Sequence, residues 1–157
     1  MTKISSRSEK SLHYFRNHYN CAQSVLTAFS DEVRLPEDIC LRISCAFGAG
    51  MGRKQYTCGA VSGALMALGL KYGKGLQDEE EKKQYTYQKT RLFIEEFEKV
   101  HGSVTCRNLL QGLDMSNPED MNKIKQLGLF EKLCEQYVLT AVKLTEKYLR
   151  QKMVDPI

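Results

Sequence analysis

The sequence has little of what fibrous, secreted or membrane proteins depend on. It contains no Trp, three Pro and 11 Gly among its 157 residues. That content is too low for a collagen-like or low-complexity chain. No apolar run approaches the roughly 18 residues of a membrane span, and the longest candidate is 60–70. Residues 1–10 lack an apolar segment and a twin arginine, so we expect no export signal and a cytoplasmic protein.

A large excess of charge of one sign is also missing. Twenty-three Lys and Arg stand against 19 Asp and Glu, giving a net charge of +4, and the two signs are interleaved. We therefore expect neither nucleic acid nor a membrane as a partner. A chain of this length with 42% hydrophobic residues can form one hydrophobic core without disulfides. Residues 1–157 are accordingly predicted to form a single domain.

Apolar residues recur three and four positions apart, which predicts helices almost throughout. We expect a compact all-α bundle of about six or seven helices, with a short helical turn at 105–110. Ile39, Ile43, Ala46 and Phe47 form a stripe that we expect to face the core. The glycine-rich segment 48–52 is predicted to be a loop that needs positive φ or close backbone approach. The predicted helices cover 8–18, 21–29, 36–47, 58–73, 77–100, 116–128 and 131–152.

The six cysteines contain no Cys-x-x-Cys pair. This excludes zinc-finger, thioredoxin-like and bacterial ferredoxin signatures, and it excludes covalent haem attachment through Cys-x-x-Cys-His. In a reducing compartment such cysteines serve packing, metal binding or redox chemistry rather than a disulfide framework. Any metal site must therefore be assembled from distant segments of the chain.

Four cysteines lie in or near the first turn of four different predicted helices: Cys21, Cys58, Cys106 and Cys134. A helix N-terminus offers unpaired N–H groups and the positive end of the helix dipole, and both favour thiolate over thiol. Thiolate is the form that binds metal and attacks disulfides. Cys40 and Cys45 lie about 140° apart around one predicted helix, and we interpret both as core residues. Cys45 is the alternative candidate because it precedes the glycine loop.

Small residues recur at every fourth position after Cys58, at Gly59, Gly63 and Ala67. Each glycine inside a helix costs about 0.5–1 kcal/mol relative to alanine, so something must offset that cost. A neighbouring helix packed closely on this strip would do so. A cofactor or ligand against bare backbone at Gly59 and Gly63 is the other interpretation, and the sequence leaves both open.

Taken together, these residues resemble a bacterial and archaeal family of redox-active proteins defined by four cysteines and a CGAxxG motif. The resemblance rests on the segments 21–25, 47–52 and 58–64, followed by Cys106 and Cys134, and it extends from about 20 to 142. It implies a small helical redox protein, often associated with an iron–sulfur cluster, in which Cys21, Cys58, Cys106 and Cys134 are the family's four cysteines. Haem segments and export signals of some relatives have no counterpart here.

Three functions follow from this sequence. The first is a redox protein in which the four cysteines bind an iron–sulfur cluster for electron transfer or redox sensing. The second is metal-free thiol–disulfide chemistry, and the third is a structural zinc site, although zinc usually draws its ligands in close pairs. We expect a redox partner protein. The sequence leaves open whether the chain is an enzyme and whether it forms a homodimer.

Overall fold

The computed structural model describes residues 6–151, and nearly all of them lie in helices or the turns between helices. The all-α class predicted from the sequence is confirmed. An isolated β-bridge joins Thr57 to Thr105. No helix within the described range is both long and apolar enough to cross a membrane. The longer helices are α1 (Arg7–Arg16), α2 (Cys21–Ala28), α3 (Glu37–Ser44), α5 (Gly59–Tyr72), α6 (Glu80–His101), α8 (Pro118–Gln126) and α9 (Glu135–Arg150).

Four short helical turns lie between the longer helices and carry much of the chemistry discussed below. Two of them, α4 and α7, raise the number of labelled α-helices in residues 6–151 above the six or seven expected. The others are a 3-10 turn and a π-helical turn that runs directly into α9. The four turns are Cys45–Phe47, α4 (Gly48–Met51), α7 (Cys106–Leu109) and Phe130–Cys134.

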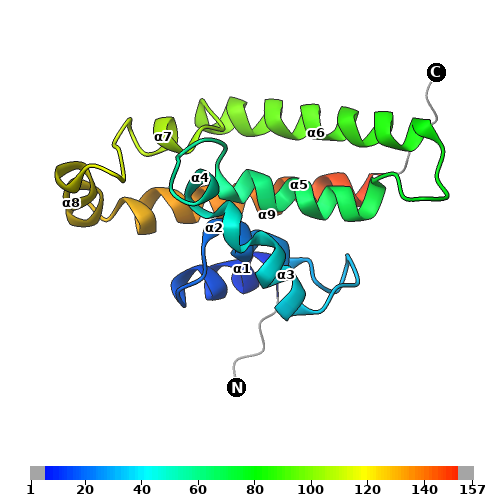
Figure 1. Ribbon diagram of the computed structural model, residues 1–157, viewed down its shortest axis with the longest axis horizontal. Helices are drawn as coiled ribbons and strands as arrows, with labels where there is room; N and C mark the ends of the chain where they lie inside the picture. The colour runs from blue at the N-terminus through cyan, green and yellow to red at the C-terminus, as the bar shows by residue number, and fades with distance from the viewer. Residues whose placement is uncertain (1–5, 152–157) are drawn as a thin grey trace.

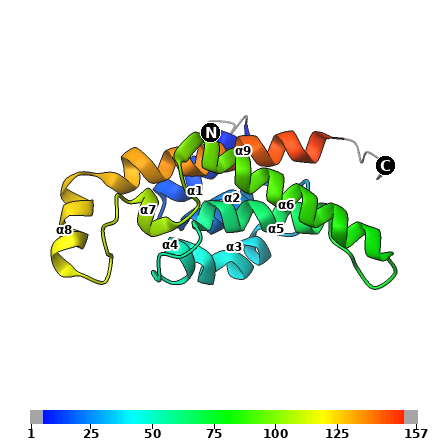
Figure 2. The same cartoon turned by 90° about the horizontal axis from the view of Figure 1, so that it is seen from above.

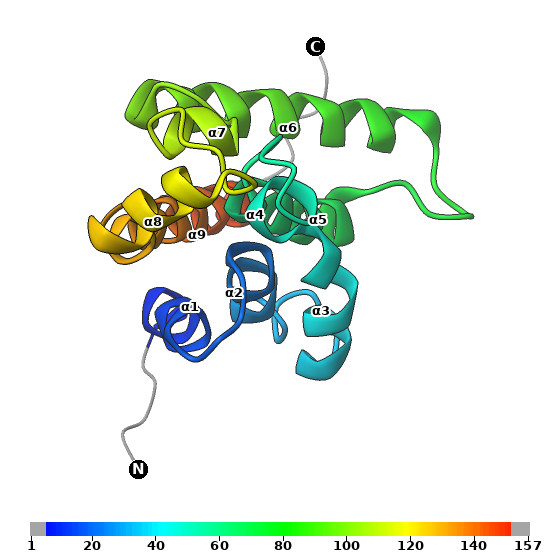
Figure 3. The same ribbon diagram turned by 60° about the vertical axis from the view of Figure 1, so that its left-hand side comes forward.

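The helices form layers around α5 and α9. Figure 1 shows α6 along one side of this pair, α1, α2 and α3 on the other, and α7 and α8 at one end. Figure 3, turned to bring that end forward, shows the same order from α6 to α1. The main core lies between these layers and includes the fully buried Leu26, Leu68, Phe93, Phe97 and Val138.

The contact between α2 and α5 is close because α5 presents glycines to α2. A Cβ atom at Gly63 would lie 2.6 Å from the carbonyl oxygen of Ala22. The start of α2 is fixed by a capping box: the Gln23 N–H donates to Asn20 Oδ1 at 2.9 Å, and the Asn20 N–H donates to Gln23 Oε1 at 3.0 Å. Together these contacts hold the first turns of α2 and α5 against each other.

The apolar stripe predicted on α3 exists, but its burial was predicted wrongly. Ile39 and Ile43 are 40% and 50% exposed, whereas Cys40 and Ser44 of the same helix are fully buried. Within α3, Ser44 Oγ donates to the carbonyl of Cys40 one turn earlier, at 2.6 Å. This hydrogen bond lets a small polar side chain occupy the core-facing position, and the isoleucines are left facing outward.

Replacing Gly63 by alanine is expected to destabilise the protein by about 1–3 kcal/mol, because the new methyl group collides with the α2 backbone. The free energy of unfolding in urea measures this. The matched control is Gly69→Ala in the same helix, where nothing lies within 4 Å of the added Cβ. That change should stabilise by about 0.5–1 kcal/mol. Equal effects of the two substitutions would contradict the role of close helix packing.

Candidate functional site

The four cysteines selected from the sequence line one cavity of about 770 Å³. They come from segments far apart in the chain: Cys21 from α2, Cys58 from the residue before α5, Cys106 from α7, and Cys134 from the turn before α9. Most other wall residues are apolar. They include Phe15, Leu109, Leu110, Met115, Met121 and Phe130. The cavity lies at the end of the molecule where α4, α7 and α8 gather (Figure 1).

Three of these cysteines occupy helix starts, as predicted. Cys21 and Cys106 are the first residues of α2 and α7, and Cys58 is the N-cap of α5. Cys134 differs, because it is the last residue of the π-helical turn 130–134, and the chain is already helical from Leu129. Cys134 was expected in or near the first turn of the last helix, and it lies just beyond the first turn of the continuous helix, as the N-cap residue of α9. A π turn is a common feature of functional sites because it changes the direction of a side chain within a helix.

The glycine-rich segment forms a left-handed turn over the cavity, which confirms the expectation of positive φ there. Its non-glycine residues each cost about 1–2 kcal/mol in this conformation. The amide N–H of Ala49 points to the sulfur of Cys21 and stabilises its thiolate. Strain of this kind persists where surrounding contacts hold it, commonly at functional sites. The successive φ values are 51° at Ala49, 64° at Gly50, 71° at Met51, 55° at Gly52 and 71° at Arg53.

Backbone hydrogen bonds tie the segment after this turn to the segment that carries Cys106. The Cys58 N–H donates to the carbonyl of Val104 at 2.7 Å. In return, the Cys106 N–H donates to the carbonyl of Tyr56 at 2.6 Å. These bonds flank the bridge between Thr57 and Thr105. They place Cys58 and Cys106 on adjoining parts of the cavity wall.

Gln55, which the sequence analysis missed, connects this strained segment to the loop before α8. Its side chain is almost fully buried, and its backbone has φ of 58°. Nε2 donates to the carbonyl of Leu113 at 2.8 Å, and Oε1 accepts from the N–H of Met115 at 2.7 Å. Both ends of the amide are therefore satisfied by one loop. Nothing in the sequence pattern marks this glutamine, because both of its partners are main-chain groups.

Contacts between α1, α7 and α9 hold one side of the cavity together. Tyr137 donates its hydroxyl hydrogen to the carbonyl of Leu109 at 2.7 Å. At the rim, the Arg16 guanidinium makes two hydrogen bonds to the Glu135 carboxylate, at 2.7 and 2.8 Å. This bidentate geometry fixes the spacing of α1 and α9.

The electrostatics distinguish Cys21 from the other three thiols. Donation from the Cys58 thiol, aided by backbone N–H groups of Ala49, Ala22 and Cys21 itself, lowers the pKa of Cys21 to about 7 despite its burial. The same interaction, together with burial, raises the pKa of Cys58. Burial raises the pKa of Cys106 to about 12 and also raises the pKa of Cys134. The negative charge of Cys21 adds to both of these shifts, so the four sulfurs share one electrostatic environment.

The four thiols are spread over the cavity wall rather than focused on one point. Within residues 6–151, no three His, Cys, Asp or Glu side chains are arranged to hold a single metal ion. Cys21 and Cys58 are the pair that interacts directly. The donor set is thus four sulfurs around a shared space, with one close pair.

The two glycines proposed as cofactor contacts have different surroundings. Gly59 lines the cavity, and a Cβ atom there would collide with the sulfur of Cys21. Gly63, one turn further along α5, lies against the backbone of Ala22. Gly59 therefore makes room for the sulfur of Cys21, whereas the contact at Gly63 serves helix packing.

The remaining two cysteines, Cys40 and Cys45, differ in burial. Cys40 is fully buried in the core, as predicted. Cys45 was also assigned to the core, and that assignment was wrong, because Cys45 is exposed and lines the cavity. α3 ends at Ser44, and the chain then tightens into a 3-10 turn that faces Cys45 outward. The Asn20 side-chain amide donates to the Cys45 carbonyl at 2.9 Å and so links this turn to the cap of α2.

Replacing Gln55 by alanine should leave the Leu113 carbonyl and the Met115 amide without their partners. Each group left unsatisfied costs about 1–3 kcal/mol. We expect faster hydrogen exchange at Met115 and a lower free energy of unfolding. Gln126→Ala, an exposed glutamine on α8, is the control and should change neither quantity. Unchanged exchange at Met115 in the Gln55 variant would show that this glutamine does not hold the loop.

Comparison with known proteins identifies the family of the chain. No curated protein and no solved structure gives a significant match to the chain. A family model described as "Putative redox-active protein (C_GCAxxG_C_C)" matches residues 19–148. The match spans all four cavity cysteines, and where the description writes Gly-Cys-Ala this chain reads Cys58-Gly59-Ala60. Because the match covers most of the sequence, the chain belongs to the C_GCAxxG_C_C family of redox-active proteins.

Proposed function

We propose that this redox-active protein binds an iron–sulfur cluster through Cys21, Cys58, Cys106 and Cys134. The observation that carries the proposal is that four thiols from four distant segments line one cavity. Four cysteine thiolates are the usual ligands of both two-iron and four-iron clusters. When bound, such a cluster supplies one-electron transfer, and the protein would serve as an electron carrier or a redox sensor.

The surroundings of the sulfurs support a cluster over a single zinc ion. A structural zinc site needs its ligands focused on one tetrahedral centre, and no such group is found in the described residues. Cluster ligands bind different irons, so they are spread around a larger volume. Hydrogen bonds to sulfur tune clusters, and the Ala49 N–H supplies one to Cys21. A reducing cytoplasm, which we propose as the location, would keep the six free thiols available.

Anaerobically purified protein is expected to be brown, with visible absorption that bleaches on reduction and near-equal iron and sulfide. Cys58→Ser should abolish the absorption and the iron together because it removes one ligand. Cys40→Ser replaces another buried cysteine, outside the cavity, and should retain both. Colourless protein that stays metal-free after anaerobic reconstitution would overturn the cluster proposal. Loss of iron in the Cys40 variant would instead overturn the assignment of ligands.

The direct interaction of Cys21 with Cys58 supports a second candidate, thiol–disulfide chemistry without metal. Oxidation of the Cys21 thiolate and the Cys58 thiol would join the two sulfurs and release two electrons and the one thiol proton, which the oxidant takes up. The lowered pKa of Cys21 makes it the attacking thiolate, and Cys58 supplies the second sulfur. Metal-free protein with a free-thiol count that falls by two on oxidation would favour this function.

In reduced, metal-free protein, the alkylation rate of Cys21 should rise with pH through a midpoint near 7, because the thiolate is the nucleophile. Cys58→Ala removes the stabilising thiol, so the midpoint should move toward the ordinary cysteine range. Mass spectrometry after iodoacetamide treatment localises and measures the reaction. Cys40→Ala should leave the profile unchanged. An unchanged midpoint in the Cys58→Ala variant would show that Cys21 and Cys58 do not share a proton.

A further inference from the structure

One exposed face next to the cavity combines apolar and cationic side chains, and we call it the loop face. Figure 2 shows α3 and α4 side by side along one edge of the molecule. Residues 39–56 include four exposed large apolar side chains, although most large apolar side chains of the described residues are buried or half-buried. The loop face consists of Ile39, Ile43, Met51, Tyr56, Arg53 and Lys54.

The apolar part of the loop face is too exposed to serve the fold. Tyr56 and Met51 are 60% and 42% exposed, and Ile39 and Ile43 lie on the outward stripe of α3. Single exposed apolar residues are ordinary, but several gathered on one surface mark interaction sites. Tyr, Met and Arg are also the residue types enriched at protein interfaces.

The charged residues of the loop face are both cations, because the chain places no carboxylate in the segment that forms it; the carboxylates on the bordering cavity wall are Glu131 and Glu135. Between Asp38 and Asp78 the sequence contains no Asp or Glu. Arg42 is neutralised by Asp38 at 2.8 Å. Arg53 and Lys54 form no ion pair with any described residue. Two unpaired cations therefore stand among the exposed apolar side chains.

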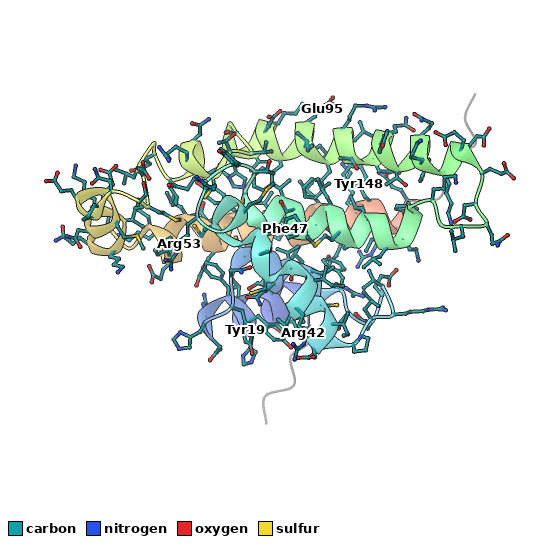
Figure 4. The ribbon with its side chains drawn as sticks, viewed as in Figure 1. Tyr19, Arg42, Phe47, Arg53, Glu95 and Tyr148 are labelled. Carbon is teal, nitrogen blue, oxygen red and sulfur yellow. The ribbon has the colours of Figure 1, made fainter. Side chains whose placement is uncertain are left out.

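The loop face also borders the cysteine cavity. Arg53 and the neighbouring Gly52 line that cavity, as does Cys45, two residues after Ile43. Figure 4 shows Arg42 at α3, Phe47 nearer the centre of the molecule and Arg53 further toward the end that carries α8, while Glu95 lies on the opposite edge, on α6. A molecule bound to the loop face would therefore stand next to the cysteine-lined space.

We propose that the loop face docks an acidic redox partner protein, which exchanges electrons with the cysteine site. This inference rests on the proposed redox function and identifies the partner by its surface chemistry. Complementary charge accelerates encounter, and a small patch of exposed apolar side chains suits the small, transient interfaces of electron-transfer pairs. Two cations are too few for tight binding to nucleic acid, whose affinity grows with each phosphate neutralised.

The first test measures oxidation of the reduced protein by anionic ferricyanide and by cationic hexaammineruthenium(III). At low salt, the double variant Arg53→Glu, Lys54→Glu should slow ferricyanide about tenfold, since steering by local charge changes rates by at least that factor. It should accelerate the ruthenium probe. Both effects should shrink at about 0.3 M salt, where screening is strong.

The matched control places the same charge change on α6. Arg91→Glu with Lys99→Glu replaces one exposed arginine and one exposed lysine, on the opposite side of α5 from α3 (Figure 3). This control should leave both rates nearly unchanged. Equal effects of the two double variants, or none from Arg53 and Lys54, would overturn the proposal. The loss of ferricyanide absorbance measures oxidation of thiols as well as of a cluster. The test of the loop face can therefore be interpreted even if the protein binds no cluster.

The second test uses oxidised flavodoxin, a small acidic electron-transfer protein, as the docking probe. Its addition should shift backbone NMR signals within residues 39–56, and salt or the Arg53/Lys54 double variant should remove the shifts. Ile43→Ser should weaken them, whereas Leu70→Ser, of nearly the same exposure on α5, should not. Shifts elsewhere would overturn the proposal. The proposal would also be overturned if phosphatidylserine vesicles shifted the signals of residues 39–56 and flavodoxin did not. That result would assign the loop face to a membrane.

Discussion

The close approach of α2 and α5 is the contact on which the rest of the site depends. Gly63 allows the backbone of α5 to meet that of Ala22, and Gly59 leaves room for the sulfur of Cys21. A side chain at either position would push the two helix starts apart. Cys21 and Cys58 would then lose the interaction that places a thiolate beside a thiol. Glycine within a helix costs about 0.5–1 kcal/mol per residue. The close packing of α2 on α5 offsets this cost.

The segment that leads from α3 to Cys58 has a less regular structure. The left-handed turn at 49–53 is unfavourable for its non-glycine residues, yet it supplies an N–H group to Cys21 and leads the chain back to Cys58. Hydrogen bonds to the segment at Cys106, and from Gln55 to the loop before α8, hold this strained turn in place. Local backbone preference is thus overruled by contacts made far away in sequence, as is typical where function rather than stability sets the conformation.

Local signals in the sequence predict the helices, and they predict three of the four cysteine positions, because caps and periodicity act over a few residues. Cys21 after the Asn20 cap is the clearest example. The π turn that presents Cys134 has no such signal, because no short-range sequence pattern marks a change from α- to π-helical hydrogen bonding. The outward direction of Ile39 and Ile43 also could not be derived, because α3 buries whichever face its neighbour accepts. The exposure of Cys45 has the same origin. Because α3 directs Cys40 into the core and ends at Ser44, Cys45 faces the cavity.

The absence of carboxylates between Asp38 and Asp78 connects the chemistry of the cavity with that of its surface. A carboxylate near Cys21 or Cys58 would disfavour thiolate by like-charge repulsion, as Glu131 does for Cys134, whose pKa it helps to raise. Keeping this stretch free of acids therefore supports the anionic form that metal binding and thiol exchange both require. The same lack of acids leaves Arg53 and Lys54 without an ion-pair partner among the described residues. One constraint on the sequence therefore accounts both for the anionic form of Cys21 and for the two unpaired cations of the proposed docking face, beside a cavity wall that also carries Glu131 and Glu135.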